Sequence, residues 1–388
     1  MRQAHLKNNL TKVAAVLAAL YLLSPCVVRG EDSQDGPRLK TAETINQFGI
    51  TWTFDKEYPC GQFANGDWWV VGPAVVTEIS PGLADGMNGS MANPMPAHEQ
   101  GYDSRAWNYN PKLSVQTPFE MDVNVSVVST ISNADTGSRK LNEVKTAAVL
   151  TCLAEVPPVG TFRPPYCGTH KPLHNVSQLK RELLPSVAPV AGATTLSEAE
   201  RWFERPWLSH LNHYKSQDIH PADNMPGYGR EVAKQTGDAA LLLTLDIPDK
   251  ETLLIRFVQY EIDNFGIFNS GGFWPHNGGH QLGRKWPILF AGMMLEDEAM
   301  SRIGSDPRKG RELTFQEDDQ TFYVTQAEVD ATHDPRWGPT HPRHPVMTLP
   351  YEQRNIGLPE WGILHVGKPS ADNMHLTGIP YRQRREGN

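Results

Sequence analysis

The stretch GQFANGDWWVVGP, residues 61–73, determines the fold expected for the first part of the chain. Its Asn65-Gly66 pair lies between apolar runs, and this dipeptide is the strongest short signal of a β-hairpin, because a type I′ turn needs positive φ at both central residues. We therefore predict a hairpin over residues 62–71.

Further strands are expected after this hairpin. The runs VNVSVVSTI (123–131) and KTAAVLTCL (145–153) are apolar or β-branched, and polar segments bound them. Residues 45–155 are thus predicted to form a β-rich, sandwich-like domain. The Pro-rich segment 156–194 follows, and its proline density excludes a regular helix or a central strand. We expect it to cross between two domains.

Helical signals dominate residues 195–303. Ser197 with Glu200 fits a capping box, Asp249 is placed to cap a helix through ETLLIRFVQYEIDNFG (251–266), and a third helix is expected over about 284–300. The apolar residues of the middle helix recur at helical spacing: Leu253, Leu254, Phe257, Val258, Ile262 and Phe265. Paired helices joined by Gly- and Pro-rich loops indicate an α-helical, toroid-like (α/α) part, so the predicted fold class is α+β.

The two ends of the chain differ from these domains. Residues 304–388 are rich in His, Pro, Arg and Trp and lose the helical pattern, so we expect an irregular C-terminal arm or the shortened end of a longer protein. Residues 1–30 are typical of a signal peptide: a basic start precedes the apolar run VAAVLAALYLL (13–23), which is shorter than the roughly 20 residues that span a bilayer. A flexible segment over 31–44 should follow the cleavage site.

The charge of the chain bears on its partners. The signal peptide carries Arg2, Lys7, Lys12 and Arg29 and no acidic residue, so its removal changes the formal net charge from -8 to -12. An acidic protein lacks the basic face that nucleic acid phosphates require. We expect a secreted or periplasmic protein with no membrane span and no nucleic acid partner. The sequence does not indicate its oligomeric state.

Three cysteines remain after the signal peptide, namely Cys60, Cys152 and Cys167. Three thiols allow one disulfide in an oxidising compartment, and a Cys152–Cys167 bond would close a short loop. The alternative is three buried thiols that act as small apolar side chains.

The densest group of polar and aromatic residues is NSGGFWPHNGGHQLGRK, residues 269–285. Glycines let a backbone approach a ligand closely, and interleaved aromatic and polar groups suit a sugar-binding loop. On the preceding helix, Gln259 with Asp263 and Tyr260 with Asn264 form two pairs at i and i+4, and both are expected to point toward this loop. The alternative is a long helix connection whose glycines serve tight turns.

This pattern of residues suits β-elimination from a uronate. One group neutralises the carboxylate so that the C5 proton becomes acidic, a base removes the proton, and an acid protonates the leaving oxygen. The predicted catalytic residues are Tyr260, His280, Arg284 and Tyr228, which lies in DNMPGYGRE. The predicted substrate-binding residues are Asn264, Trp274, His276, Asn277, Lys285 and Arg230. No cofactor and no metal are expected.

A signal peptide, a β-rich part and paired helices ending in His- and Arg-bearing loops resemble secreted polysaccharide lyases with an α/α-toroid domain. The phrases ITWTFDKEYP, GQFANGDWWVVGP and GGHQLGRKWPILFAG also resemble a group of uncharacterised exported bacterial proteins. The resemblance implies a lyase acting on an extracellular polysaccharide. The order of the two parts is the reverse of that usual in the toroid lyases, and the Asn-Asn-His signature of the alginate lyases does not occur, so no catalytic residue is transferred from them.

Other interpretations remain open. A glycoside hydrolase needs two carboxyl groups at one cleft, and the candidates are Asp263, Glu261, Glu231, Asp67 and Asp103. A glycan-binding or cell-surface protein without catalysis would use exposed aromatic residues, and Trp68 and Trp69 are neighbours in a strand, so only one of them belongs to the core. Two histidine groups, His276 with His280 and His333 with His341 and His344, have spacing that would admit a metal, although zinc-protease spacing is absent.

Overall fold

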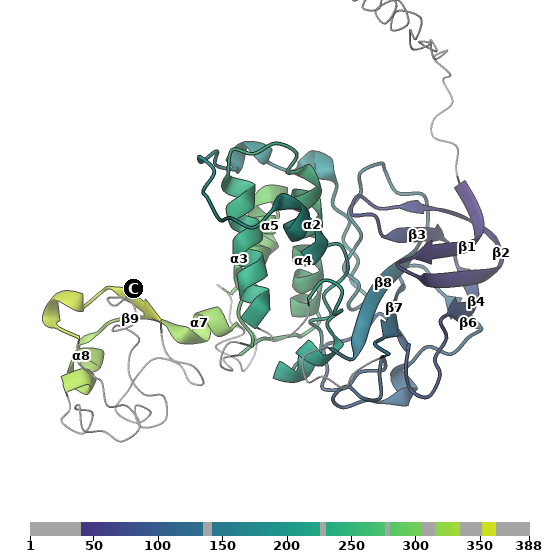
Figure 1. Cartoon of the computed structure of the whole chain (residues 1–388), viewed down its shortest axis with the longest axis horizontal. Coiled ribbons are helices and arrows are strands. Elements are labelled where there is room, and N and C mark those ends of the chain that lie inside the picture. Colours follow the sequence, from purple (N-terminus) through teal and green to yellow (C-terminus); the bar gives the residue numbers. More distant parts are fainter. Residues whose placement is uncertain are drawn as a thin grey trace, which may run out of the picture. The chain divides into compact units, whose positions relative to one another are not determined.

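The structure, a computed structural model, describes residues 40–134, 142–225, 230–275, 280–304, 315–333 and 351–361. Strands make up the N-terminal part of the described chain and helices follow (Figure 1). The predicted α+β content, with the strands first, is confirmed.

Eight strands form one sheet in the order β5-β7-β8-β3-β2-β4-β6, with β1 paired to β2. All neighbouring strands are antiparallel except β3 and β8, which run parallel. The strands are β1 (Lys40–Gln47), β2 (Ile50–Gln62), β3 (Trp68–Val71), β4 (Ala74–Ser80), β5 (Ser90–Ala92), β6 (Phe119–Met121), β7 (Ser126–Ser132) and β8 (Val144–Leu153). The segment expected to be loose, 31–44, therefore ends in a strand.

The predicted hairpin is confirmed, but its turn differs from the predicted one. Strands β2 and β3 pair with Gln62 opposite Trp68. The Phe63 amide donates to the carbonyl of Asp67, and the Gly66 amide donates to the carbonyl of Phe63. Gly66 has a φ of 92°, whereas Asn65 does not have positive φ. The connection is thus a type I turn followed by a left-handed glycine, the usual geometry of a three-residue loop.

The sheet folds over so that strands far apart in its order face each other. The indole Nε1 of Trp52 on β2 donates to Ser129 Oγ on β7 across 3.0 Å, although β3 and β8 lie between these strands in the sheet. Trp52 and Phe54 are buried with Val127 and Leu150 in the cluster that this fold encloses. The β-rich part is thus one curved sheet in which β2 and β7 come into contact.

The helical part follows a crossing segment that contains no α-helix or strand over residues 156–194, as predicted; its regular elements are the 3₁₀ turns η2 (Val176–Gln178) and η3 (Arg181–Leu183). The α-helices of the described residues are α2 (Leu196–Trp202), α3 (Arg230–Thr244), α4 (Glu251–Asn269), α5 (Lys285–Leu295), α6 (Glu298–Ser301), α7 (Gln316–Gln320) and α8 (Gln326–His333). A small sheet joins β9 (Thr321–Tyr323) to β10 (Pro359–Trp361). Three helices of more than ten residues, among the seven described, do not establish an α/α toroid.

The helix ends differ from the predicted ones by one or two residues. Thr195, not Ser197, caps α2, because its side chain accepts from the amide of Glu198. Asp249 lies outside α4 with a left-handed φ of 62°, and Lys250 flanks the helix without a side-chain cap. The third predicted helix is two helices, because Glu296 adopts a left-handed φ and Asp297 then caps α6.

One hydrophobic cluster joins the sheet to the helices. It contains Met91, Val128 and Val149 from the strands together with Phe257 and Ile288 from α4 and α5. The described residues, which begin at Lys40, belong to one compact unit. The β-rich part and the helical part therefore share this core, and the sheet also buries a second cluster of its own.

The cysteines Cys60, Cys152 and Cys167 are free thiols and all are buried. The expected Cys152–Cys167 disulfide is therefore not formed. Burial raises the pKa of both Cys152 and Cys167 to about 12, so these thiols stay protonated and serve as apolar side chains.

Candidate functional site: a buried polar cluster at helix α4

Helix α4 is buried around its whole circumference, and several of its buried residues are polar. A helix that is apolar on one side only would lie at the surface, so α4 is the central helix of this part. Its buried polar residues are Gln259, Tyr260, Glu261, Asp263 and Asn264. Buried polar groups need hydrogen-bond partners, and their contacts define the candidate site.

Tyr260 faces the start of α5, while the side-chain oxygen and nitrogen of Asn264 are buried without a hydrogen-bond partner among the described residues. The Tyr260 hydroxyl donates to the carbonyl of Gly283 across 3.2 Å. Burial raises the pKa of Tyr260, while the charge of Arg284 lowers it part of the way. The phenol therefore holds its proton at neutral pH.

Arg284 lies beside Tyr260 and is fully buried. Its Nη1 donates to the carbonyls of His280 and Leu282, each across 2.9 Å. Its Nε and Nη2 have no hydrogen-bond partner within the described part of the chain. Burial lowers the pKa of Arg284, and Tyr260 and Glu317 oppose that effect. One edge of the guanidinium is thus held by backbone carbonyls, and the other edge presents two donors.

Glu317 on α7 caps the start of α5. Its Oε1 accepts from the amide of Gly283 across 2.7 Å and from the amide of Arg284 across 3.1 Å. Burial raises the pKa of Glu317, and these two amides and the Arg284 charge lower it. A carboxylate at this position interacts favourably with the positive end of the helix dipole. This contact holds the loop before α5 against α7.

His220 belongs to the same cluster, although the sequence did not point to it. It is fully buried, and within the described residues neither ring nitrogen has a hydrogen-bond partner. Its ring lies 6.3 Å from the ring of Trp207, and Trp207 lies 4.5 Å from the ring of Tyr260. Burial lowers the pKa of His220 well below its usual value, and Arg284 and His210 lower it further. The imidazole is therefore neutral at pH 7.

The remaining predicted site residues have different outcomes. His280 contributes its carbonyl to Arg284. Lys285 is paired with Asp318 on α7. Trp274 is buried, stacks on Phe315 and donates its Nε1 to the carbonyl of Ser209, so its ring is not available to stack on a sugar. Tyr228, His276 and Asn277 lie outside the described residues, and Arg230 begins α3 with a side chain that is also outside them.

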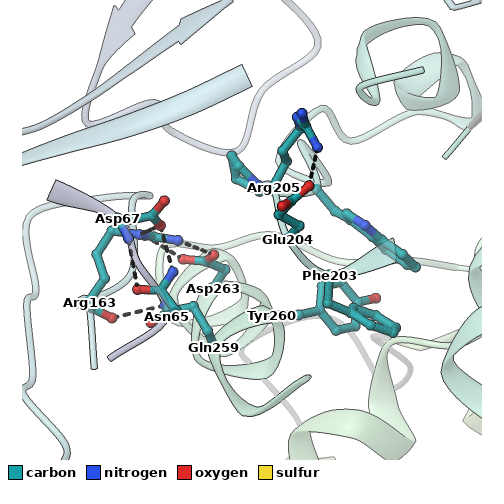
Figure 2. A pocket seen from close by; sticks show the side chains of 11 residues that line it. Asn65, Asp67, Arg163, Phe203, Glu204, Arg205, Gln259, Tyr260 and Asp263 are labelled. Carbon is teal, nitrogen blue, oxygen red and sulfur yellow. Dashed lines mark hydrogen bonds and ion pairs between the residues drawn. The ribbon is translucent and has the colours of Figure 1, made fainter. Parts of the chain in front are cut away.

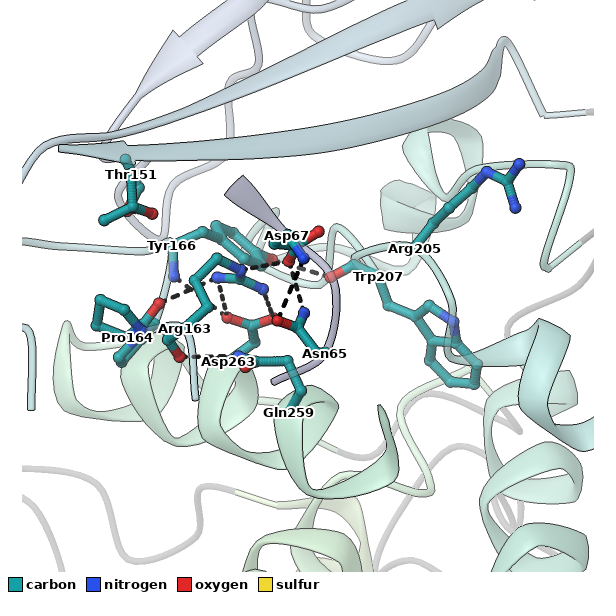
Figure 3. A network of polar contacts seen from close by, with 12 residues as sticks. Asn65, Asp67, Thr151, Arg163, Pro164, Tyr166, Arg205, Trp207, Gln259 and Asp263 are labelled. Atoms are coloured by element: carbon teal, nitrogen blue, oxygen red, sulfur yellow. Dashed lines mark hydrogen bonds and ion pairs between the residues drawn. The ribbon is translucent and has the colours of Figure 1, made fainter. Parts of the chain in front are cut away.

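Gln259 and Asp263 face the crossing segment and not the 269–285 loop, contrary to the prediction. Arg163 donates Nη1 and Nη2 to the two carboxylate oxygens of Asp263 across 2.9 and 2.6 Å, and its Nε to Asp67 across 2.6 Å (Figure 3). Gln259 donates to the Arg163 carbonyl. All of these groups are buried, so Arg163 joins the hairpin loop, the crossing segment and α4 in one charged network.

The other candidate carboxylates do not form an acid and base pair. Glu261 is fully buried with no hydrogen-bond partner among the described residues, and burial raises its pKa well above the usual range. Asp103 is buried in an ion pair with Arg105. Asp67 and Asp263 come together only through Arg163, whose guanidinium forms an ion pair with each of them.

A small cavity lies between the Arg163 network and Tyr260. It has an empty volume of about 230 Å³, including space open to solvent. Figure 2 draws Asp67, Arg163 and Asp263 on one side of it and Phe203 and Tyr260 on the other. The cavity reaches Tyr260 but does not accommodate a chain of sugars in this arrangement.

No family model, curated protein or solved structure matches the chain. Among the described helices none has the length and apolar character that crossing a membrane requires. Within the described residues, no three His, Cys, Asp or Glu side chains are grouped to hold a metal ion, and His341 and His344 of the second predicted histidine group lie outside these residues.

Proposed function

We propose that this protein is an exported, polysaccharide-active enzyme that cleaves uronic-acid-containing glycans by β-elimination at the cluster of Tyr260, Asn264 and Arg284. The observation that carries the proposal is the position of Tyr260 next to Arg284, with two donors of Arg284 and both polar side-chain atoms of Asn264 left without hydrogen-bond partners in the described chain. We also propose that the protein is related to the secreted polysaccharide lyases with an α/α-toroid domain.

The elimination assigns one task to each group. Arg284 binds the uronate carboxylate and spreads the negative charge that develops when the C5 proton leaves. A histidine, His280 in this proposal, takes that proton. The electron pair of the C5–H bond forms the C4=C5 double bond, the C4–O bond breaks, and the leaving oxygen takes a proton from Tyr260. Burial keeps the Tyr260 phenol protonated, which suits the acid and not the base.

Two other residues are weaker candidates for these tasks. Lys285 is held by Asp318, so Arg284 is the better carboxylate partner. Tyr228 remains a second candidate for the proton carrier. Because Tyr260, Asn264 and Arg284 are buried, a uronate unit reaches them only in a more open arrangement than this one.

Hydrolysis by a carboxylate pair has less support. The Asp67 and Asp263 pair is bridged by Arg163, which leaves neither carboxylate as a free base.

The proposed export is supported by the basic start and the apolar run of residues 1–30. Amino-terminal sequencing of the protein secreted by its host tests the export and the cleavage site, and we expect Glu31 to be the first residue.

Incubation of the purified chain with a panel of uronans tests the reaction, with the ultraviolet absorbance of an unsaturated uronate as the readout. We expect absorbance to rise on at least one uronan and on no neutral glycan. Arg284→Met should abolish the rise, whereas Arg302→Met, at an exposed surface pair, should leave it unchanged. No rise on any uronan would overturn the lyase proposal. New reducing ends without unsaturation would indicate a hydrolase, and binding without turnover would indicate a glycan-binding protein.

A further inference from the structure

The cavity beside the Arg163 network contains polar groups that the proposed elimination does not use. Four segments far apart in the sequence line it, namely the loop between β2 and β3, the crossing segment, the residues after α2, and α4 (Figure 2). The cavity meets the proposed catalytic cluster at Tyr260. Its chemistry is therefore considered apart from Arg284 and Asn264.

Gln259 offers an unused hydrogen-bond acceptor at this cavity. The residue lines the cavity and is 3% exposed, and its Nε2 donates to the carbonyl of Arg163 across 3.0 Å. This bond fixes which end of the amide is the oxygen. The Oε1 has no hydrogen-bond partner within the described part of the chain. A buried acceptor without a partner is unfavourable, and a ligand that donates a hydrogen bond removes that cost.

The neutral donors that line the cavity are already engaged. Asn65 Nδ2 donates to Asp67 across 2.7 Å. The indole of Trp207 donates to a backbone carbonyl across 2.7 Å, and the Tyr260 hydroxyl donates to another across 3.2 Å. The cavity therefore favours a ligand that donates hydrogen bonds over one that accepts them.

The charged side chains of the lining carry an excess of negative charge. They are Asp67, Asp263, Glu204, Arg163 and Arg205. Three carboxylates and two guanidiniums leave a formal charge of -1. Outside the lining, Arg256 lies 3.8 Å from Glu204 and Asp223 lies 3.9 Å from Arg205, so these two further charges offset each other. A positively charged donor therefore suits the cavity better than a neutral one.

Aromatic rings form the wall opposite the Arg163 network. The ring of Trp207 lies 4.5 Å from that of Tyr260 and 4.9 Å from that of Phe203, measured between centroids, and all three residues line the cavity. The face of an aromatic ring attracts a cation. An unused amide oxygen, an excess of carboxylate and an aromatic wall thus occur together at one cavity.

We propose that this cavity is a binding site for one primary ammonium group, which donates to Gln259 Oε1 and lies against the aromatic wall. An ammonium group is compact, so it fits a cavity whose volume of about 230 Å³ includes space open to solvent. The carrier of the ammonium is an amino sugar next to the uronate, and only this carrier rests on the proposed function. A free amine has the same head group, so the experiment tests the two separately.

Calorimetry of the full chain with methylammonium chloride tests the site. Methanol is the neutral control of similar size, and potassium chloride is the control for a metal cation. We expect methylammonium to bind, methanol not to bind, and potassium to bind at least about tenfold more weakly, because it donates no hydrogen bond to Gln259. Glucosamine should compete with methylammonium, whereas glucose should not.

Three variants locate the binding. Gln259→Met removes the acceptor from a side chain of similar length and should weaken methylammonium binding by at least about tenfold. Glu204→Gln removes the excess negative charge and should also weaken it. Gln353→Met, at an exposed glutamine, should leave the affinity unchanged.

Each outcome decides the proposal. No binding of methylammonium, equal binding of methanol or potassium, or unchanged affinity in both lining variants would overturn the site. Where Gln259→Met does not fold, Glu204→Gln and the methanol control still decide. Binding of methylammonium but not of glucosamine would uphold the site and refute the amino sugar as its carrier.

The same measurements separate this site from the proposed reaction. Binding of methylammonium without elimination from any uronan would uphold the site and refute the lyase proposal. Elimination without binding of methylammonium would refute the site alone.

Discussion

Arg163 is the residue on which the contact between the hairpin loop and α4 depends. Its side chain is fully buried and pairs with Asp67 and Asp263 at 2.6 Å. Removing one partner of a buried ion pair leaves an uncompensated charge, here two carboxylates, and costs about 3–5 kcal/mol. We therefore expect Arg163→Met to lower the free energy of unfolding in urea by that amount.

The exposed pair of Arg302 with Glu298 provides the control for this measurement. Both side chains are 73% exposed, so Arg302→Met should leave the urea midpoint unchanged. A similar midpoint for the two variants would contradict a stabilising role for the Arg163 network.

Glu261 makes stability depend on pH. Burial raises its pKa in the folded protein, so the native state keeps a proton that the unfolded state loses above about pH 4.3. The native state then binds more protons than the unfolded state, and stability falls as the pH rises, by up to about 1.4 kcal/mol per pH unit from this group. The contribution of Glu261 to stability is fully present below about pH 4.3 and decreases as the pH rises toward the pKa of Glu261 in the folded protein.

The variant Glu261→Gln isolates this effect because glutamine resembles the protonated carboxyl. We expect the stability of the variant relative to the wild type to increase as the pH rises from about 5 to 8, measured by denaturant unfolding at each pH. A constant difference between the two proteins across this range would show that Glu261 is ionised in the folded state.

At the scale of the elements, Gly266 lets the crossing segment pack closely on α4. A Cβ at this position would overlap the ring of Pro165, which is two residues from Arg163. Gly237 in α3 has no atom within 4 Å of the same position. Gly266→Ala should therefore destabilise the protein by about 1–3 kcal/mol, whereas Gly237→Ala should stabilise it by about 1 kcal/mol.

Thermal unfolding of the two glycine variants checks this prediction, with a lower melting temperature for the α4 variant and a higher one for the α3 variant. Equal shifts in the same direction would indicate that helix propensity, and not packing against Pro165, decides the effect.

The elements were predictable where one local signal dominates. The hairpin at Asn65-Gly66 and the apolar period of α4 were both found from the sequence. The helix caps were not, because Thr195 and Ser197 offer the same chemistry two residues apart, and the tertiary contacts decide which of them accepts from a free backbone amide of the first turn. The side of α4 that carries Gln259 and Asp263 was assigned wrongly because its partner, Arg163, lies 96 and 100 residues away.

Part of the candidate site was predictable because its residues are close to one another in the sequence. Tyr260, Asn264 and Arg284 belong to one helix and the loop that follows it, so spacing brought them together. His220 follows the 3₁₀ turn η4 (Tyr214–Ile219) in an extended conformation, and its burial beside Trp207 arises only from the tertiary fold. The surrounding sequence, DIHPADN, contains no motif or spacing that indicates a functional histidine.

At the scale of the whole molecule, the shared core predicts one cooperative unfolding transition. Strand residues such as Val149 and helix residues such as Phe257 belong to the same cluster, so the unfolding of either part exposes buried apolar side chains of the other. We expect the near-ultraviolet and far-ultraviolet circular dichroism to change with the same midpoint in urea. Two separated midpoints would show that the parts fold independently.

The central claim is that the Tyr260 hydroxyl transfers a proton in a uronate elimination, and the turnover of Tyr260→Phe on a cleaved uronan tests it most directly. Phenylalanine keeps the ring that packs on Trp207 and removes only the hydroxyl, and Tyr323→Phe, at a side chain that is 65% exposed, is the matched control. We predict that Tyr260→Phe loses about 100-fold or more of the wild-type turnover, while Tyr323→Phe retains it. Wild-type turnover by a folded Tyr260→Phe variant would contradict the account.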